Sequence, residues 1–322
     1  MMTTTLSKKG IIALVASVAG LVVVPFIFPE EYYLNLIFLV GLYSILSQSW
    51  NIFGGYCGQI SLGHAAFFGV GALACRYLWI AGASYYVALL GGAAGSVLVS
   101  CIIGIPALKL RSHYFAIGTL ALAMIALIAV QNNLPGVNFL PGELMADYTV
   151  VSRYYIAIAM AIATQAIVYG LTNSKIGLAM VCIREDEDAA EAAGINVFKY
   201  KVAAMAISAA LAGVAGGLFA IYYVSFYPYV PFELTWSFYP LLITFIGGAG
   251  TILGPVVGSI CYVILREIFA LSTGQFSVLI FGAVFICIVL FLPTGLLGLS
   301  EYFYRPQRGR LQAEIENRKH PN

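Results

Sequence analysis

Polar side chains able to bind a ligand are few in this sequence, and several of them lie close together. One apolar stretch of the N-terminal half contains Gln48, Asn51, Gln59, Ser61 and His64. Amides, hydroxyls and a neutral imidazole form hydrogen bonds without placing a fixed charge in apolar surroundings. The group therefore suits either a small polar solute or unwound backbone. His64 has a further alternative, because a lone histidine of this kind is more often a core residue of a helix.

These residues belong to the first of two glycine-punctuated segments, residues 50–72 and 245–259. Paired broken segments in the two halves of a chain are typical of transporters built from two repeats, where irregular backbone lines a cavity or is buried by protein. The alternative is that the glycines only let helices pack closely, as we also expect for Gly213 and Gly217. The predicted translocation-pathway residues are Gln48, Asn51, Gln59, Ser61, His64, Gly247, Gly248 and Gly250.

A charged stretch, residues 184–196, contains five of the fourteen acidic residues and lies between two long apolar runs. The order of the residues, with acidic side chains first, alanines next and Gly194 last, predicts a short helix over residues 186–193 with a left-handed glycine cap. Its small methyl groups would let another protein approach closely, and Glu185, Glu187 and Glu191 would face basic partner groups. A solvated tether is the alternative. The predicted docking residues are Arg184, Glu185, Asp186, Glu187, Ala190, Glu191, Ala193 and Gly194.

The composition excludes a soluble globular protein. Of the 322 residues, 61% are hydrophobic and 9% are charged, against about 25% charged in soluble domains. With ~20 residues per crossing, we predict an all-α polytopic membrane protein of about ten transmembrane or re-entrant helices in two related halves. Residues 1–300 form one transmembrane domain with a cytoplasmic loop at 173–201, and residues 301–322 form a basic cytoplasmic tail. The apolar runs fall at 11–29, 33–53, 62–81, 86–108, 113–131, 154–172, 202–223, 236–250, 254–270 and 276–297.

Basic residues set the predicted orientation. With the N-terminus inside, thirteen of the sixteen Lys and Arg residues fall on the cytoplasmic side, leaving only Arg76, Arg153 and Arg266. Both termini and the loop at 173–201 are therefore expected in the cytoplasm. This orientation needs an even number of crossings, so residues 236–270 count as two passes or as one pass with a re-entrant piece. The first 28 residues are interpreted as a retained span, because no A-x-A cleavage site follows their apolar core.

Several kinds of chemistry find no support in the sequence. The six cysteines show no C-x-x-C pair, so neither a metal site nor a disulfide framework is indicated, and no cofactor is expected. His and carboxylate residues do not cluster as an enzyme would require. No acidic residue lies in the middle of a confident span, where it could relay protons. No phosphate-binding loop of the G-x-x-x-x-G-K-[ST] type occurs either. The energy for transport is therefore expected from a separate ATPase.

Three motifs resemble one known family. The string I-R-E-D-E-D-A-A-E-A-A-G-I-N and the K-Y-K after it, within residues 183–201, resemble the cytoplasmic coupling loop of LivM-type permease subunits of branched-chain amino acid ABC importers. Glu191, Ala192, Ala193 and Gly194 match its E-A-A-G core. G-Q-I-S-L-G-H-A-A-F-F-G-V-G-A (58–72) and L-K-L-R-S-H-Y-F-A-I-G-T-L (108–120) resemble two further family motifs. The resemblance covers about residues 35–297, but N-N-L-P-G-V-N (132–138) replaces a T-G-G-x-x-G-like stretch that many relatives carry.

The resemblance implies a subunit of a bacterial inner-membrane ABC importer. Its expected partners are a second homologous permease, two cytoplasmic ATPase subunits, a periplasmic substrate-binding protein and membrane lipid, but no nucleic acid. The departure at residues 132–138 leaves the solute open among branched-chain amino acids, urea, short amides and other amino acids. The competing hypothesis is a self-sufficient secondary transporter or channel in which the charged loop acts as a regulatory tether.

Overall fold

The computed structural model describes residues 19–27, 29–110, 112–145, 149–273, 282 and 295–298. The predicted run at 11–29 is described only from residue 19 on, the run at 276–297 lies largely outside the described residues, and the predicted tail at 301–322 lies wholly outside them.

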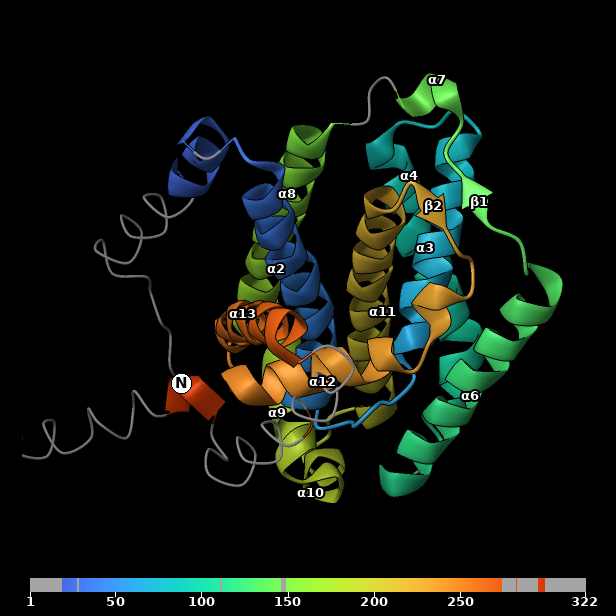
Figure 1. The fold of residues 1–322 in the computed structure, drawn as a ribbon. Helices are drawn as coiled ribbons and strands as arrows, with labels where there is room; N and C mark the ends of the chain where they lie inside the picture. Colours follow the sequence, from blue (N-terminus) through green and yellow to red (C-terminus); the bar gives the residue numbers. More distant parts are fainter. Residues whose placement is uncertain are drawn as a thin grey trace, which may run out of the picture.

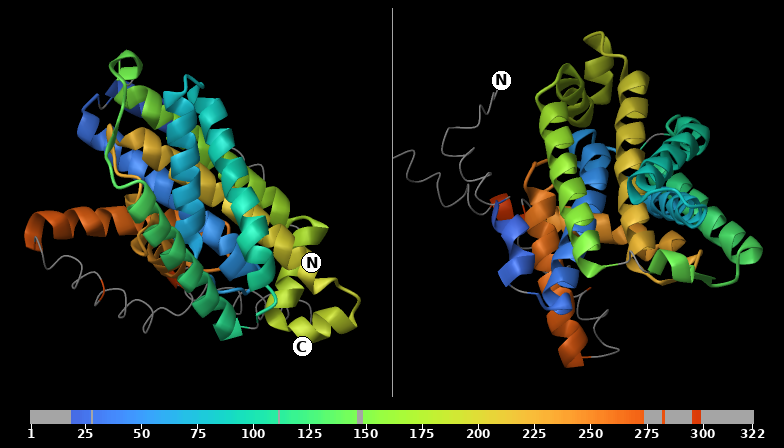
Figure 2. Two further views of the ribbon diagram at one scale, coloured as in Figure 1. Left: turned by 90° about the vertical axis from the view of Figure 1, so that its right-hand side faces the viewer. Right: turned by 90° about the horizontal axis from the view of Figure 1, so that it is seen from above.

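Long apolar helices make up most of the described chain and run alongside one another (Figures 1 and 2). Among the described residues, five segments are long and apolar enough to cross a membrane, which confirms an all-α polytopic membrane protein. They are Glu31–Tyr56, Tyr85–Ala107, Tyr114–Asn133, Val150–Thr172 and Val197–Tyr222. The helices are α2 (Glu31–Trp50), α3 (His64–Ile80), α4 (Tyr85–Val99), α5 (Ile105–Ala107), α6 (Ser112–Asn133), α8 (Val150–Thr172) and α11 (Val197–Tyr222), with π-helical η1 (Asn51–Tyr56) and η2 (Ser100–Gly104).

Helix α11 forms the centre of the bundle and packs against α2, α3 and α4. In the most apolar part of α11, 83% of the residues are buried, whereas in that of α6 only 17% are. Small residues permit the close approach of α11, because a Cβ atom on Gly213 would lie 2.8 Å from the carbonyl oxygen of Gly92. The predicted close-packing role of Gly213 is confirmed, and α6 presents most of its surface to whatever surrounds the bundle.

Two shorter elements follow α11. Helix α12 (Thr235–Gly247) has 13 residues, or about 20 Å of rise, which is less than the ~30 Å hydrocarbon core of a bilayer. An irregular stretch, residues 248–253, joins it to α13 (Gly254–Thr273). Helix α12 alone is therefore too short to cross, and the predicted total of ten passes remains a prediction.

The chain's turns place two distinct ends on the bundle (Figure 1). One carries α9 (Lys175–Glu185) and α10 (Glu187–Ala192). The other carries α7 (Gly142–Met145) and a two-stranded antiparallel sheet of β1 (Asn138–Phe139) and β2 (Ser225–Phe226), which the all-α prediction did not include. The short 3-10 helix η3 (Val230–Phe232) packs against α3, where Phe232 lies next to Gly69.

A buried arginine holds the strand-bearing end together. The guanidinium of Arg76 donates to the carbonyl oxygens of Ala220, Asn138 and Val224, at 3.2, 2.9 and 2.7 Å. Arg153 likewise donates to the carbonyl oxygen of Tyr222 at 3.0 Å. Both arginines thus lie at the C-terminal end of α11, where cations are favoured, on the opposite end of the bundle from α10 as predicted.

Candidate functional site

A small protruding element, residues 186–194, forms the tip of the end that carries α9 and α10, and we call it the acidic knob (Figure 1). Its helix α10 begins after Asp186, whose side chain accepts a hydrogen bond from the Ala189 amide at 2.9 Å. At its end, the amides of Gly194 and Ile195 donate to the carbonyls of Glu191 and Ala190, and Gly194 has φ +85°. This Schellman cap confirms the predicted short helix and left-handed glycine. Helix α10 is one residue shorter at each end than predicted.

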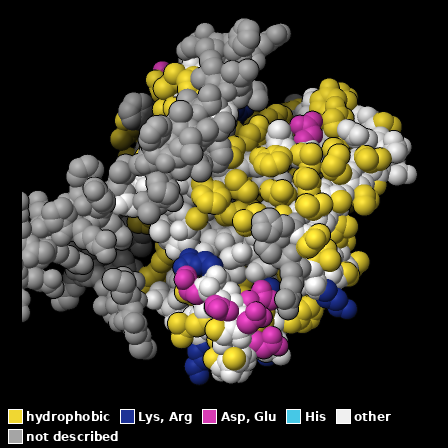
Figure 3. Space-filling model, turned by 90° about the horizontal axis from the view of Figure 1, so that it is seen from below, with side chains coloured by type: hydrophobic (Ala, Val, Ile, Leu, Met, Phe, Trp, Pro, Cys, Tyr) yellow, Lys and Arg dark blue, Asp and Glu magenta, His cyan; other side chains and the backbone are white. Residues whose placement is uncertain are grey.

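The alanines of the knob divide into two faces. Ala190 is 4% exposed and packs into the hydrophobic core. Ala189, Ala192 and Ala193 are exposed. Ala190 therefore anchors the knob to the bundle and does not belong to a methyl surface open to a partner, whereas the other three do. Figure 3 shows acidic side chains gathered at this end of the molecule next to a largely hydrophobic surface.

The carboxylates of the knob, together with Glu185 just before it, also divide into paired and unpaired groups. Glu187 forms an ion pair with Lys201 at 2.6 Å, and the Lys201 side chain is only 6% exposed. Glu185 pairs with the neighbouring Arg184 at 2.6 Å. Within the described residues, Asp188 and Glu191 form no ion pair. Of the three glutamates predicted to meet basic partner groups, only Glu191 remains without an ion pair.

Arg184, which precedes Glu185 at the end of α9, connects the knob to both glycine-rich segments. Its Nη1 donates to the carbonyl oxygen of Gly55 at 3.0 Å. The same nitrogen lies where a Cβ atom on Gly250 would be only 2.8 Å away, and a Cβ on Gly58 would lie 2.8 Å from Arg184 Cγ. Glycine is needed at these places because the guanidinium and its stem occupy the space. Arg184 thus places α9 in direct contact with residues 55–58 and with Gly250.

The two glycine-rich segments also contact each other, although about 200 residues separate them. The amide of Asn51 donates to the carbonyl oxygen of Thr251 at 2.9 Å, and its oxygen accepts from the Gly250 amide at 2.8 Å. Gln48 donates to the carbonyl oxygen of Ile252 at 2.7 Å. Gly250 itself has φ +74°, a conformation in which glycine is favoured. Two roles were predicted for these side chains, binding of a small polar solute and hydrogen bonding to unwound backbone. In the structure, Gln48 and Asn51 form hydrogen bonds with the unwound backbone of residues 250–252.

The other predicted pathway residues lie elsewhere. His64 is 1% exposed, and its Nε2 lies 2.9 Å from the hydroxyl of Ser208 on α11, as expected of a core histidine. Ser61 is 2% exposed and accepts from the Gly63 amide at 3.2 Å. Gln59 is half-buried, and its backbone amide donates to the Phe53 carbonyl. Gly247 ends α12, and Gly248 follows it with φ +123°. Gln48, Asn51 and Gly250 thus come together, and Gly248 is linked to them through Thr251, whose hydroxyl donates to its carbonyl oxygen. His64 and Ser61 do not join them.

One polar partner of this group was missed by the sequence analysis. Gln165, in the middle of α8, accepts a hydrogen bond from the Gln48 amide at 2.9 Å. A single glutamine in an otherwise apolar span is itself a signal, because its amide must find a partner there. In the described part of the chain, no group of three or more His, Cys, Asp or Glu side chains is placed to hold a metal ion.

The bundle of apolar helices has two glycine-rich segments that contact each other, and one arginine ties them to a charged knob. This arrangement is typical of a membrane transport subunit. Comparison with known sequences gives its family. Residues 32–289 match the family described as "Branched-chain amino acid transport system / permease component", and the chain belongs to this family. It is a multi-pass membrane protein and a permease component of an ABC importer.

Individual relatives agree with this assignment. The chain is 25% identical to the LivM high-affinity branched-chain amino acid permease protein of Escherichia coli, over 86% of this chain and 72% of the relative. A probable LivM protein of Methanocaldococcus jannaschii is 25% identical over 84% of this chain and 94% of its own length. The LivH permease protein of Escherichia coli is 31% identical over 44% of this chain and 45% of its own. No solved structure matches the chain.

Proposed function

We propose that this chain forms part of the translocation pathway of a bacterial importer for branched-chain amino acids or a similar small polar solute. The substrate class follows from the names of the relatives, which are described as branched-chain amino acid transport permeases. The chain would reside in the cytoplasmic membrane, with both termini and the acidic knob on the cytoplasmic side. Its basic residues, concentrated around the predicted inner loops, support this orientation.

The proposed partners occupy different faces of the molecule. A cytoplasmic ATPase subunit would bind the exposed side of the knob, where Glu191, Ala192 and Ala193 are accessible. A second, homologous permease would pack against the bundle, and the similarity of this chain to both LivM and LivH proteins supports a pair of related subunits. The second ATPase of the importer would bind that subunit. A periplasmic binding protein would deliver solute at the opposite, strand-bearing end, and lipid would cover the remaining apolar surface.

Arg184 carries this proposal. ATP-driven closure of the ATPases would push the knob, and Arg184 would pass the displacement to residues 55–58 and to Gly250 through the contacts described above. Residues 57–63 and 248–253 lie outside helices, so the chain can reorient there with less loss of helical hydrogen bonding than an intact helix would suffer. Helices α3 and α12, which adjoin these segments, would then tilt and alternate the access of the pathway.

Reconstitution tests the proposal. The chain, its partner permease and the ATPases are placed in liposomes, and uptake of radiolabelled leucine is measured with and without ATP and the binding protein. Uptake that requires all components supports the importer. Leucine flux driven by an ion gradient through the purified chain alone would instead establish the secondary-transporter alternative.

A further inference from the structure

Helix α6 lies at the edge of the bundle and faces it along one narrow stripe (Figures 1 and 2). The buried residues of this stripe are Phe115, Thr119 and Ala123, which are spaced four residues apart and so lie on one face of the helix. Phe115 packs against Phe53 of η1, with ring centroids 5.6 Å apart. The opposite face is exposed, as Ile117 shows. The position of α6 therefore depends on the contacts of a single face.

Thr119 connects α6 to residues 57–63, the stretch outside helices that leads into α3. Its Oγ1 accepts a hydrogen bond from the Leu62 amide at 3.2 Å. The Thr119 hydroxyl donates to the Ala116 carbonyl oxygen of its own helix at 3.0 Å, so towards Leu62 it acts as an acceptor. A Cβ atom on Gly63 would lie only 2.8 Å from the Thr119 carbonyl oxygen. The backbones of the stretch and of α6 are thus in direct contact.

The amide of Leu62 differs from its neighbours in where its partner lies. The amides of Cys57 and Gln59 donate to carbonyl oxygens of η1, and that of Gly63 donates to the hydroxyl of Ser61, all within one segment of the chain. The Leu62 amide instead depends on another helix. A part-buried amide that loses its partner destabilises the arrangement. We therefore expect α6 and this stretch to move together.

The same stretch is contacted near its beginning by Arg184. A Cβ atom on Gly58 would lie 2.8 Å from Arg184 Cγ, and the Arg184 guanidinium donates to the carbonyl oxygen of Gly55 at 3.0 Å. Residues 58–63 therefore join Arg184, beside the knob, to Thr119 on α6. A short non-helical connection of this kind can pass a displacement from one end to the other because both of its ends are in contact with a helix.

A small gap beside Thr119 leaves α6 room to shift. A cavity of about 20 Å³ lies there and is lined mainly by apolar groups, among them Phe67 of α3, Gly104 of η2 and Met205 of α11. One water-sized sphere needs roughly 10–15 Å³, so the cavity is about that large. Because protein interiors are otherwise close-packed, such a gap lets α6 shift towards the bundle before its stripe meets α3 and α11.

From these contacts we propose that α6 is a moving helix of the transport cycle and that Thr119 is the positioning residue that moves it. A displacement of the knob passes from Arg184 through residues 58–63 to Thr119, and α6 shifts with them. This inference rests on the proposed import function and adds to it, because α6 is a helix to which that function assigned no part.

Distances between spin labels on α6 and α8 test the motion. The labels are attached to unnatural amino acids that replace Ile125 on α6 and Ile162 on α8, both of which are exposed. Helix α8 serves as the reference because it packs along α2. Pulsed electron paramagnetic resonance of the assembled importer, with binding protein and leucine, should give different distances without nucleotide and with ATP bound. An unchanged distance in the otherwise unaltered importer would overturn the proposal.

Substitution of Thr119 tests its role in that motion. Thr119→Val keeps the shape of the side chain but removes the acceptor for the Leu62 amide. We expect the ATP-dependent change in distance to be lost and the leucine transported per ATP hydrolysed to fall roughly fivefold, at the low end of coupling between sites. Thr119→Ser keeps the hydroxyl and should restore both quantities. Unaltered values of both quantities in the valine variant would overturn the role of Thr119.

Thr164→Val is the matched control, because the Thr164 hydroxyl is also buried but donates only to the Met160 carbonyl oxygen of its own helix, at 2.8 Å. It should change neither quantity. Thermal unfolding of both valine variants separates stability from coupling, since a merely structural Thr119 would lower Tm and leave the distance change and the transport ratio as they were. Uptake of leucine with a stationary α6 would refute this inference alone. Absence of ATP-dependent uptake in the unaltered importer would refute the proposed function itself.

Discussion

The acidic knob has two sides that look alike in the sequence and differ in the structure. On the inner side, Ala190 is buried, Glu187 is paired with Lys201, and the adjoining Arg184 reaches the glycine-rich segments. On the outer side, Glu191 and Ala193 are exposed, and Glu191 has no ion pair within the described residues. The same short helix thus offers one face to a partner and fixes the other to the bundle. Docking and transmission should therefore be separable by mutation.

Blocking the outer side should have the largest effect. Ala193→Trp places an indole on the exposed face without changing the capped backbone, because Ala193 has φ −77°. A closely fitting ATPase subunit would clash with the ring, so we expect solute-stimulated ATP hydrolysis to fall to the level of the ATPase subunits alone. The measurement is ATPase activity of the reconstituted importer, together with recovery of the ATPase subunits on affinity purification.

Ala193→Ser is the size control for this variant and should keep full activity. A tryptophan variant that retains both stimulated hydrolysis and bound ATPase subunits would show that the outer side of the knob is not the docking face.

Cutting the inner connection should have a smaller but distinct effect. Arg184→Gln removes the donor to the Gly55 carbonyl and the charge beside Gly250, while the outer face stays intact. The ATPase subunits should remain bound, but leucine transported per ATP hydrolysed should fall roughly tenfold, within the usual range of coupling between sites. Parallel measurements of uptake and hydrolysis give this ratio. An unchanged ratio would remove Arg184 from the pathway of transmission.

The smallest effect is expected at the ion pair between the knob and α11. Glu187→Gln leaves the nearly buried Lys201 without its charged partner. Because the Glu187 side chain is 47% exposed, solvent weakens the pair, and the loss should be at most about 1 kcal/mol, or roughly 1–2 °C in Tm for a chain of this length. Thermal unfolding in detergent measures the shift.

Adding Lys201→Met to Glu187→Gln should restore the lost stability, because the double variant leaves no unpaired charge. A double variant less stable than the single one would show that the ammonium group stabilises the knob through other contacts. The single and the double variant should bind the ATPase subunits equally well, in contrast to the Ala193→Trp variant.

Local features of the fold were predictable because they depend on neighbouring residues. Apolar runs gave the long helices, and the acid-to-alanine order with a final glycine gave α10 and its cap, since both follow from short-range hydrogen bonds. The division of the knob's alanines was not predictable in the same way. Ala190 differs from Ala189 only in which neighbour it meets, and that is decided by the packing of the bundle.

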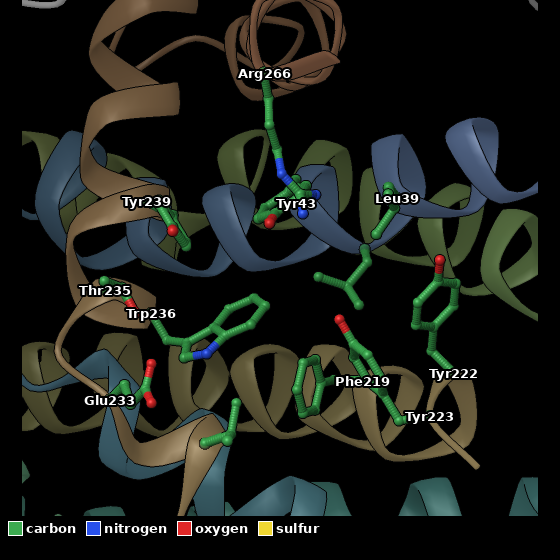
Figure 4. Close-up of a pocket in the computed structure, with 12 residues that line it drawn as sticks. Leu39, Tyr43, Phe219, Tyr222, Tyr223, Glu233, Thr235, Trp236, Tyr239 and Arg266 are labelled. Atoms are coloured by element: carbon green, nitrogen blue, oxygen red, sulfur yellow. The ribbon is translucent and has the colours of Figure 1, made fainter. Parts of the chain in front are cut away.

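Long-range contacts limited the prediction of the site. Nothing near Asn51 in the sequence indicates that its amide will bind Gly250 and Thr251, so a pathway-lining role was as reasonable as a structural one. An aromatic cavity lined by Tyr43, Trp236 and Arg266 (Figure 4) was missed for the same reason, because Tyr43 and Arg266 lie in opposite halves of the chain. The one available signal was Arg266 itself, a charge within the predicted apolar run at 254–270 and one of the three basic residues not assigned to the cytoplasmic side.

Photo-crosslinking from the knob tests the central claim most directly. A photoreactive phenylalanine analogue replaces Ala193 in one importer preparation and Phe139, which is 66% exposed on β1 at the opposite end, in another. After irradiation, products are separated by mass. The account predicts a product joining this chain to an ATPase subunit from position 193 and none from position 139. A product with the ATPase from position 139 only, or only lipid and internal products from position 193, would contradict it.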